Sequence, residues 1–248
     1  GAGALAEVVQ DPALGTRAPD PAAEGRAGWA VRARGRGHVR FVDFEALSDL
    51  AQDLGTPLHI KARPGALVVT GDVLTLLSVD PGDRADAIAD AFNLGSARSF
   101  DQDGRLAFVL LSEIADRALS PGVNDPGTAI LAISWIEDLI RANPLVQPGT
   151  ARWPGLHMAP VTADDLMTDG YAAIARDGAG MIEVAGALVA ALARIAAEAR
   201  LRSDPATHLA AERLAALAIA HAEVQLPLEQ EKAMLRGLWP GRAATPPP

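Results

Sequence analysis

The chain has 248 residues, of which 49% are hydrophobic, and a formal net charge of −9 from 22 basic and 31 acidic side chains. Its length and hydrophobic content exclude a disordered chain, and the acidic balance argues against a dedicated nucleic-acid-binding protein. The absence of cysteine excludes disulfides, thiolate metal sites and a cysteine nucleophile. No uncharged apolar stretch reaches the roughly 18 residues that span a bilayer, so we expect a water-soluble, globular chain.

The first part of the chain predicts a small β-rich unit. Residues 3–10 are typical of the end of a helix, and residues 11–28, rich in Pro, Gly, Asp and Ala, are typical of a loop or linker. Period-two alternation of apolar side chains then predicts strands near 29–33, 39–41, 58–62 and 74–79. A short helix over 44–54 interrupts them, because Asp43 is suited to cap its start and Gly55 its end.

From residue 83 onward the chain is predicted to be mostly helical. Helices are expected at 83–94, 104–119, 126–142, 164–177, 181–200, 205–226 and 228–238, with a proline-rich loop over 144–161. Leu106, Leu110 and Ile114 are spaced for one buried face. The helix after Asp125 is apolar on two adjacent faces, one of them carrying Leu131 and Trp135, which predicts deep burial. Leu214, Leu217, His221 and Val224 form a later apolar stripe, on which His221 is predicted to be a core or boundary residue.

These elements predict an α+β fold, in which a small N-terminal β-rich, barrel-like unit packs on a larger, mainly α-helical region. The expected divisions are a linker over 1–28, the β-rich unit over 29–82, the helical region over 83–240 and a disordered tail over 241–248. No internal repeat is evident along the chain.

The strongest local signal is the segment from Ala118 to Ala129, which predicts a helix end, a tight polar loop and a second, capped helix. Asn124 and Asp125 are suited to satisfy the free N–H groups of the second helix, so a structural role is the first interpretation. The alternative is a polar or anion-binding pocket at this helix start. Together with an upstream polar loop, the segment gives a candidate ligand-binding site of nine residues: Ser99, Asp101, Gln102, Asp103, Arg117, Ser120, Asn124, Asp125 and Thr128.

Asp101 and Asp103 are the candidates for chemistry, because two nearby carboxylates suit general acid–base catalysis or a hard metal ion. They suit the cap of the following helix equally well. Glu113 and Arg117 are spaced for an i, i+4 ion pair, although Arg117 could instead hold an acidic loop residue or an anionic ligand. The five histidines form no zinc-ligand motif. We therefore expect no catalytic residue, no metal site and no cofactor.

Arginines make the start of the β-rich unit basic against an acidic body, at Arg26, Arg32, Arg34, Arg36 and Arg40. A solvated strand face is the simplest interpretation. Attraction to anionic lipid headgroups is the second interpretation. Nucleic acid is not expected as a partner, because no aromatic residues are interleaved for base stacking.

Four motifs, taken in order, resemble a known family. Residues 36–43 are similar to a Gly-aromatic-Val-Gln-x-Ile-Asp motif, and residues 63–71 to an Arg-Pro-Gly-x-x-Val-x-x-Gly motif. Residues 95–103 resemble Gly-x-x-Arg-Thr-x-x-Gln-Asp, and residues 118–129 match Ala-Leu-Ser-Pro-Gly-Ile-Asn-Asp-Pro-x-Thr-Ala. The chain is thus similar, over residues 30–140, to the bacterial predicted membrane protein family called domain of unknown function 2254. His38 and Arg40 depart from the first motif, where an aromatic residue and Gln are usual.

The resemblance implies that transmembrane helices precede this region and that the chain is the soluble C-terminal portion of a membrane protein, in agreement with its start at Gly1. The family brings no assigned activity. We therefore expect a regulatory module that binds a small ligand or a partner. Its membrane side is expected to be cytoplasmic, with the periplasmic or extracellular side as the alternative. The other functions considered are a metal-assisted hydrolase using Asp101 and Asp103, and a structural domain that forms homo-oligomers through its Ala-rich helices.

Overall fold

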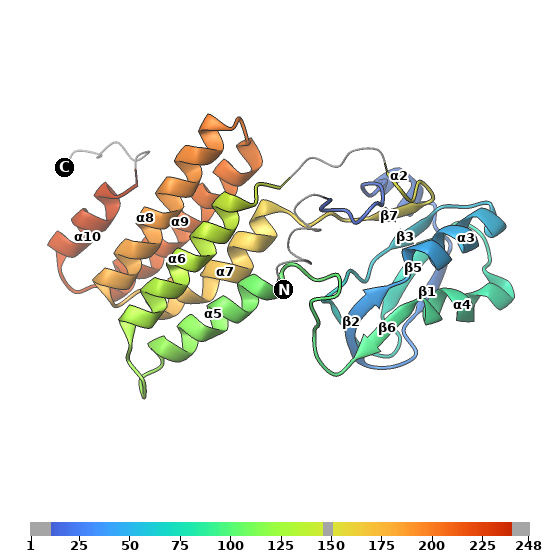
Figure 1. Ribbon diagram of the computed structural model, residues 1–248, viewed down its shortest axis with the longest axis horizontal. Helices are drawn as coiled ribbons and strands as arrows, with labels where there is room; N and C mark the ends of the chain where they lie inside the picture. The colour runs from blue at the N-terminus through green and yellow to red at the C-terminus, as the bar shows by residue number, and fades with distance from the viewer. Residues whose placement is uncertain (1–10, 146–150, 240–248) are drawn as a thin grey trace. The chain divides into compact units, whose positions relative to one another are not determined.

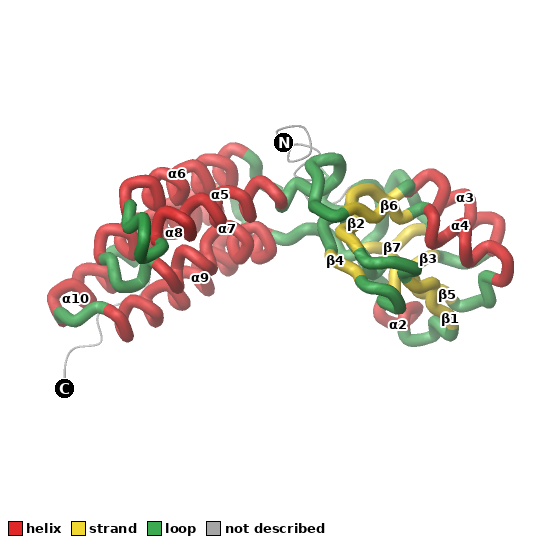
Figure 2. Tube along the Cα trace, turned by 90° about the horizontal axis from the view of Figure 1, so that it is seen from below, coloured by secondary structure: helices red, strands yellow, loops and turns green. Residues whose placement is uncertain are grey.

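The computed structural model describes residues 11–145 and 151–239, and their contacts divide the chain into two compact units. The β-rich unit contains the described residues among 1–106 and 145–161, and the helical unit contains those among 107–144 and 162–248. All strands of the described chain belong to the first unit, whereas the second consists of helices joined by loops (Figure 1, Figure 2). The predicted α+β class is therefore confirmed. The predicted helix end at 3–10 and the predicted disordered tail lie outside the described residues.

The strands of the β-rich unit form two sheets. One sheet has the order β1-β5-β3-β7, with β1 at Trp29–Arg32, β5 at Val73–Leu77, β3 at Leu58–Ile60 and β7 at Leu156–Met158. The other has the order β4-β2-β6, with β4 at Leu67–Val68, β2 at Gly37–Val42 and β6 at Phe92–Gly95. The consecutive strands β1 and β2 join different sheets, and no closed barrel is found among the described strands.

The helix α3 (Phe44–Leu54) begins and ends where the sequence predicts. The Asp43 side chain accepts a hydrogen bond from the backbone N–H of Ala46, and Gly55 closes the helix in the left-handed conformation with a φ of 63°. Leu47 on its inner face is fully buried in a core that it shares with Val39 of β2. The caps and this apolar face fix the position of the residues that precede α3.

The predicted helix over 83–94 was wrong in its second half. The chain forms a short 3-10 turn, η1 (Gly82–Arg84), and the helix α4 (Ala85–Asp90), and then enters strand β6. Phe92 of β6 lies opposite Val42 of β2 and is buried. Pairing with a buried neighbouring strand thus prevails over the local helical pattern.

Residues 11–28 pack within the β-rich unit. Ala13 and Thr16 are buried, and the short helix α2 (Pro21–Glu24) follows. The backbone N–H of Arg17 donates to the Leu156 carbonyl, and that of Met158 donates to the Arg17 carbonyl. Strand β7 therefore lies in the stretch predicted as a loop, where it pairs in parallel with β3. A three-residue strand depends on partners far away in the sequence, so no local pattern reveals it.

The helical unit is built from α6 (Pro126–Ala142), α7 (Ala163–Asp177), α8 (Ile182–Leu201) and α9 (Pro205–Gln225), which pack side by side (Figure 1). Before them comes α5 (Leu106–Leu119), and after them comes α10 (Glu229–Gly237). The predicted N-caps are confirmed, because the side chains of Asp125, Thr162 and Asp204 each accept from a backbone N–H three residues further on.

Two predicted apolar stripes are buried only in part. On α5, the buried residues are Phe108, Ala115 and Leu119, whereas Leu110 and Ile114 are exposed. Phe108 packs beside Gly170 of α7, where an added Cβ would lie 3.5 Å from the Phe108 ring. On α9, Leu214 is buried and His221 is half-buried, as predicted, whereas Leu217 and Val224 are exposed. Alanines form much of the buried face.

The broad apolar surface of α6 predicted that this helix is deeply buried. The structure shows that it is not buried on all sides. Ile133 and Ile136 are buried, whereas Leu131 and Trp135 are 46% and 44% exposed. Thr128, Leu131 and Trp135 follow the i, i+3, i+7 spacing of a single helical stripe. Two exposed apolar side chains, Leu131 and Trp135, thus lie on the same stripe of α6 as Thr128 of its first turn.

Candidate functional site

Asp103 ends the polar loop between β6 and α5 in the β-rich unit, and its side chain has a structural role. Its carboxylate is buried and accepts from Nε and Nη2 of Arg98 at 2.6 and 3.0 Å. Gly65 approaches it so closely that an added Cβ would lie 2.4 Å from Oδ2, and Gly65 has a φ of +86°. This position therefore needs glycine for both space and conformation. The bidentate pair holds the loop against the β4 side of the unit.

Gln102 connects the same loop to β2. Its Oε1 accepts from the backbone N–H of Val42 at 2.8 Å, and its Nε2 donates to the Val42 carbonyl at 3.0 Å. The side-chain amide thus bonds both backbone groups of Val42, the last residue of β2. This bridge satisfies two strand groups that would otherwise need water.

Asp101 and Asp103 contact different residues. It is exposed, accepts from the Ser99 hydroxyl at 2.8 Å, and has Arg40 Nη2 at 3.6 Å. The two carboxylates are therefore engaged by different arginines. No group of three or more metal-binding side chains occurs within the described residues. The geometry does not favour the use of this pair in metal-assisted hydrolysis.

The polar residues of the loop 120–125 also satisfy the backbone. Asp125 accepts from the N–H and the hydroxyl of Thr128 at 3.1 and 2.5 Å, and these bonds lower the pKa of its carboxyl group. The Ser120 hydroxyl donates to the Arg117 carbonyl at 2.7 Å. Asn124 adopts a φ of 48°, a conformation that Asn tolerates well. The structural interpretation thus accounts for Ser120, Asn124 and Asp125.

A concave apolar surface lies beside this loop, and we call it the α5–α6 groove. It has a volume of about 520 Å³ and is lined by Leu110, Glu113, Ile114, Arg117, Ala118, Val123, Asp125 and Thr128. Leu110, Ile114 and Val123 are 40%, 44% and 56% exposed. The predicted ion pair between Glu113 and Arg117 was wrong for the described chain, where no such contact is formed. The Arg117 guanidinium is thus left at the rim of an apolar groove.

The nine predicted residues accordingly fall into two groups. The structure brings Ser99, Asp101, Gln102 and Asp103 together in the β-rich unit, and it brings Arg117, Ser120, Asn124, Asp125 and Thr128 together in the helical unit. Sequence reasoning missed the apolar side of the groove. Its signal was present in the spacing of Leu110 and Ile114, which was interpreted as a core stripe.

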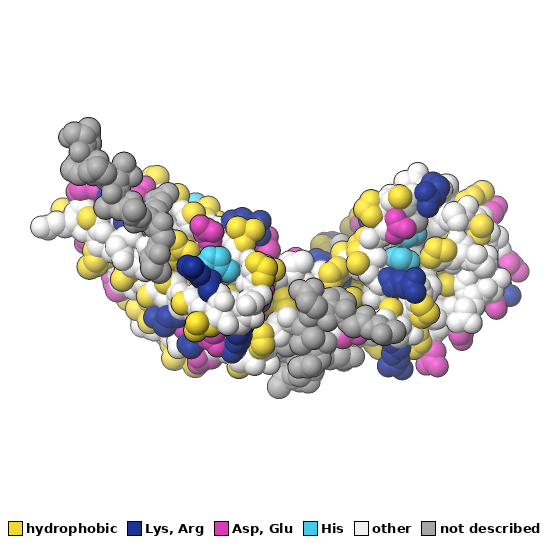
Figure 3. Space-filling model, turned by 90° about the horizontal axis from the view of Figure 1, so that it is seen from above, with side chains coloured by type: hydrophobic (Ala, Val, Ile, Leu, Met, Phe, Trp, Pro, Cys, Tyr) yellow, Lys and Arg dark blue, Asp and Glu magenta, His cyan; other side chains and the backbone are white. Residues whose placement is uncertain are grey.

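A pair of histidines lies on neighbouring strands of the β-rich unit. The rings of His59 on β3 and His157 on β7 are 5.0 Å apart, and His59 Nδ1 lies 4.0 Å from Glu24 Oε1. Burial and the nearby His157 lower the pKa of His59. Lys61 binds the same Glu24 at 3.1 Å, and histidine, acidic and basic side chains adjoin on the face of this unit seen in Figure 3.

The arginines at the start of the β-rich unit are mostly engaged. Arg34 pairs with Asp86 and Asp90, and Arg40 lies beside Asp101. Arg32 donates to the Gly71 carbonyl at 2.8 Å. These contacts favour the simplest interpretation, a solvated and internally neutralised surface.

A family model places the chain among predicted membrane proteins. The model of the family described as "Predicted membrane protein (DUF2254)" matches residues 4–194, and the chain belongs to this family. The match extends beyond the motifs at 30–140 on both sides. Neither the curated proteins nor the solved structures contain a match. Among the residues that the structure describes, no helix is long and apolar enough to cross a bilayer.

Proposed function

We propose that this domain is a non-enzymatic module of a membrane protein that binds a small, neutral and largely apolar ligand in the α5–α6 groove. The observation that carries the proposal is the exposure of Leu110, Ile114 and Val123 inside one concave surface. Its volume of about 520 Å³ lies within the range of small-molecule sites. Removal of these side chains from water would supply the binding free energy.

The charges at the rim support a neutral ligand. Arg117 and Glu113 contribute one charge of each sign, and the Asp125 carboxylate is already occupied by Thr128. An anionic or cationic ligand would meet an opposite and a like charge at similar range. The rim polar groups therefore orient the ligand and contribute little net attraction.

The experiment is a fluorescence titration with N-phenyl-1-naphthylamine, a neutral apolar probe. We expect the unmodified chain to bind it and Ile114→Gln to bind it about tenfold more weakly, because a polar amide replaces buried apolar area. Val224→Gln is the matched control, since Val224 is 86% exposed on α9 and does not line the groove. Equal binding by all three proteins would exclude the groove as the site.

The proposed location is the cytoplasmic side of the membrane, because Lys and Arg near a membrane-spanning segment favour that side even where acidic residues neutralise them. A second candidate function, self-association, is favoured by the exposed side chains of Leu209, Leu217 and Val224 on α9. Light scattering tests it, because a monomer at micromolar concentration would exclude a structural role in oligomers.

A further inference from the structure

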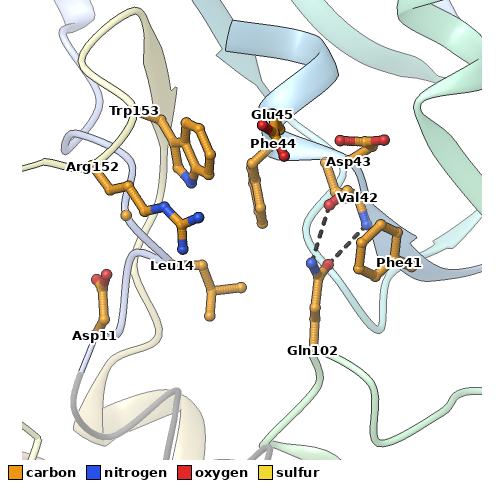
Figure 4. A pocket seen from close by; sticks show the side chains of 11 residues that line it. Asp11, Leu14, Phe41, Val42, Asp43, Phe44, Glu45, Gln102, Arg152 and Trp153 are labelled. Carbon is orange, nitrogen blue, oxygen red and sulfur yellow. Dashed lines mark hydrogen bonds between the residues drawn. The ribbon is translucent and has the colours of Figure 1, made fainter.

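A second cavity lies wholly within the β-rich unit and differs in chemistry from the α5–α6 groove. It has a volume of about 220 Å³, and its walls come from residues 11–15, the β2–α3 junction, Gln102, and Arg152 with Trp153. Figure 4 shows Arg152 reaching from beside Trp153 toward the space between Leu14 and Phe44. The volume is below the roughly 300–1,000 Å³ typical of drug-sized ligands. A smaller molecule is therefore the fitting occupant.

Arg152 is positioned to bind a planar anionic group. Its guanidinium lies 4.5 Å from the centre of the Trp153 ring, which orients it by a cation–π contact. Within the described residues, the Arg152 side chain forms no hydrogen bond or ion pair. Its N–H groups are thus available to a carboxylate, which suits the guanidinium in a bidentate geometry.

The wall that carries Trp153 is held in place. The backbone N–H of Trp153 donates to the Gly15 carbonyl at 2.7 Å, and a Cβ on Gly15 would lie 2.8 Å from the Trp153 ring. Leu14 has a φ of 52°, which is unusual for a large side chain. Backbone conformations of this kind cost free energy and are found most often at functional sites. These contacts hold this wall of the cavity in place.

The other charges of the cavity exclude a simple anion. Asp11, Asp43 and Glu45 also line it, and the Asp43 carboxylate is occupied because it caps α3. Two carboxylates without such a role, Asp11 and Glu45, then face one guanidinium. A phosphate or a simple carboxylate would be repelled by both, and a simple cation would be repelled by Arg152. A molecule that carries both charges satisfies both kinds of group.

We propose that this cavity binds a small zwitterion of the α-amino acid class. The carboxylate of the ligand binds Arg152, and its ammonium group binds Asp11, which lies on the same side of the cavity (Figure 4). Its side chain contacts Leu14 and Phe44, so apolar amino acids are preferred. The site is independent of the α5–α6 groove, because all its residues belong to the other unit.

The test is isothermal titration calorimetry of the whole chain with the standard L-amino acids, with L-leucine as the reference probe. We expect binding of L-leucine, and binding weaker by about tenfold or more for 4-methylpentanoate, which lacks the ammonium group, and for 3-methylbutylamine, which lacks the carboxylate. Arg152→Gln and Asp11→Asn should each weaken L-leucine by a similar factor. Arg36→Gln, an exposed arginine outside the cavity, should leave it unchanged.

Several results would overturn the assignment. They are the absence of binding by every amino acid at millimolar concentration, equal binding of L-leucine and its two analogues, and unchanged binding in Arg152→Gln. Displacement of L-leucine by inorganic phosphate at millimolar concentration would also overturn it. Ile114→Gln separates this site from the proposed groove, because it should leave L-leucine binding intact. Thermal melting of each variant confirms that the chain remains folded.

Discussion

The two polar loops of the molecule contain similar residues, but these residues have different structural roles. In the β-rich unit, the carboxylates of the loop 99–103 are paired with Arg98 and Arg40, and the Gln102 amide completes strand β2. In the helical unit, the polar residues of 120–128 cap α6, and the apolar residues beside them remain exposed. A polar motif is therefore a poor guide to a site when its groups already satisfy each other. The informative feature is the apolar surface that no element covers.

The largest expected effect is a difference in the free energy of unfolding between substitutions on the two faces of α5. Phe108→Ala should destabilise the chain by about 3–5 kcal/mol, because Phe108 is 1% exposed and its removal leaves a cavity. Leu110→Gln should change stability by no more than about 0.5 kcal/mol, because Leu110 is already in water. Urea unfolding of the two variants measures both. Similar losses would show that the groove face of α5 is part of the core.

The next effect concerns the two carboxylates of the loop 99–103. Asp103→Ala should cost about 3 kcal/mol, because it leaves Arg98 without its partner in a largely buried site. Asp101→Ala, in an exposed position, should cost less than about 1 kcal/mol. Hydrogen exchange should locate the loss for Asp103→Ala in the amides of the β-rich unit. Equal effects of the two substitutions would contradict the division of roles.

A smaller loss is expected at Gln102. Gln102→Ala removes both hydrogen bonds to Val42, and it should cost about 2 kcal/mol because the strand groups then rely on water. Gln102→Glu keeps one acceptor and loses the donor, so it should retain part of the stability. If Gln102→Ala unfolds at the same urea concentration as the unmodified chain, the bridge has no structural role.

The two units are also expected to respond to pH in opposite directions. The folded pKa of His59 lies below its unfolded value of 6.5 because of burial, so the unfolded chain takes up the proton first. Stability from this group is present above that value and is lost as the pH falls below it. His59→Gln should therefore flatten the loss of stability between about pH 7 and pH 5. An unchanged pH profile would contradict this origin.

The smallest effect is expected at Asp116 of α5. Burial, followed by the charge of Asp177, raises the pKa of its carboxyl group, so its contribution is present at low pH and is lost as the pH rises through the folded pKa. One of its oxygens is buried and has no partner within the described residues. Asp116→Asn should stabilise the chain at pH 7 by about 0.5 kcal/mol and have no such effect at pH 3. Destabilisation at pH 7 would show that the ionised Asp116 carboxylate forms a stabilising interaction in the folded chain.

Local signals predicted the parts of the fold that depend on neighbouring residues. The caps at Asp43, Asp125 and Thr162 are encoded within one helical turn, and all three are observed. The strands β6 and β7 were missed because their partners, β2 and β3, lie far away in the sequence. The periodicity of α5 showed an apolar stripe but not whether another helix covers it. Burial is a property of tertiary packing, so the groove could not be predicted from spacing alone.

The central claim is that the α5–α6 groove, and not the loop 99–103, binds an apolar ligand. The most direct test is the titration of the neutral apolar probe against two variants, one in the groove and one in the loop. Ile114→Gln should weaken binding about tenfold, whereas Asp101→Ala should leave it unchanged. That result would place the apolar ligand in the α5–α6 groove and leave the loop 99–103 with its structural role. Unchanged binding in Ile114→Gln together with a loss in Asp101→Ala would contradict the account.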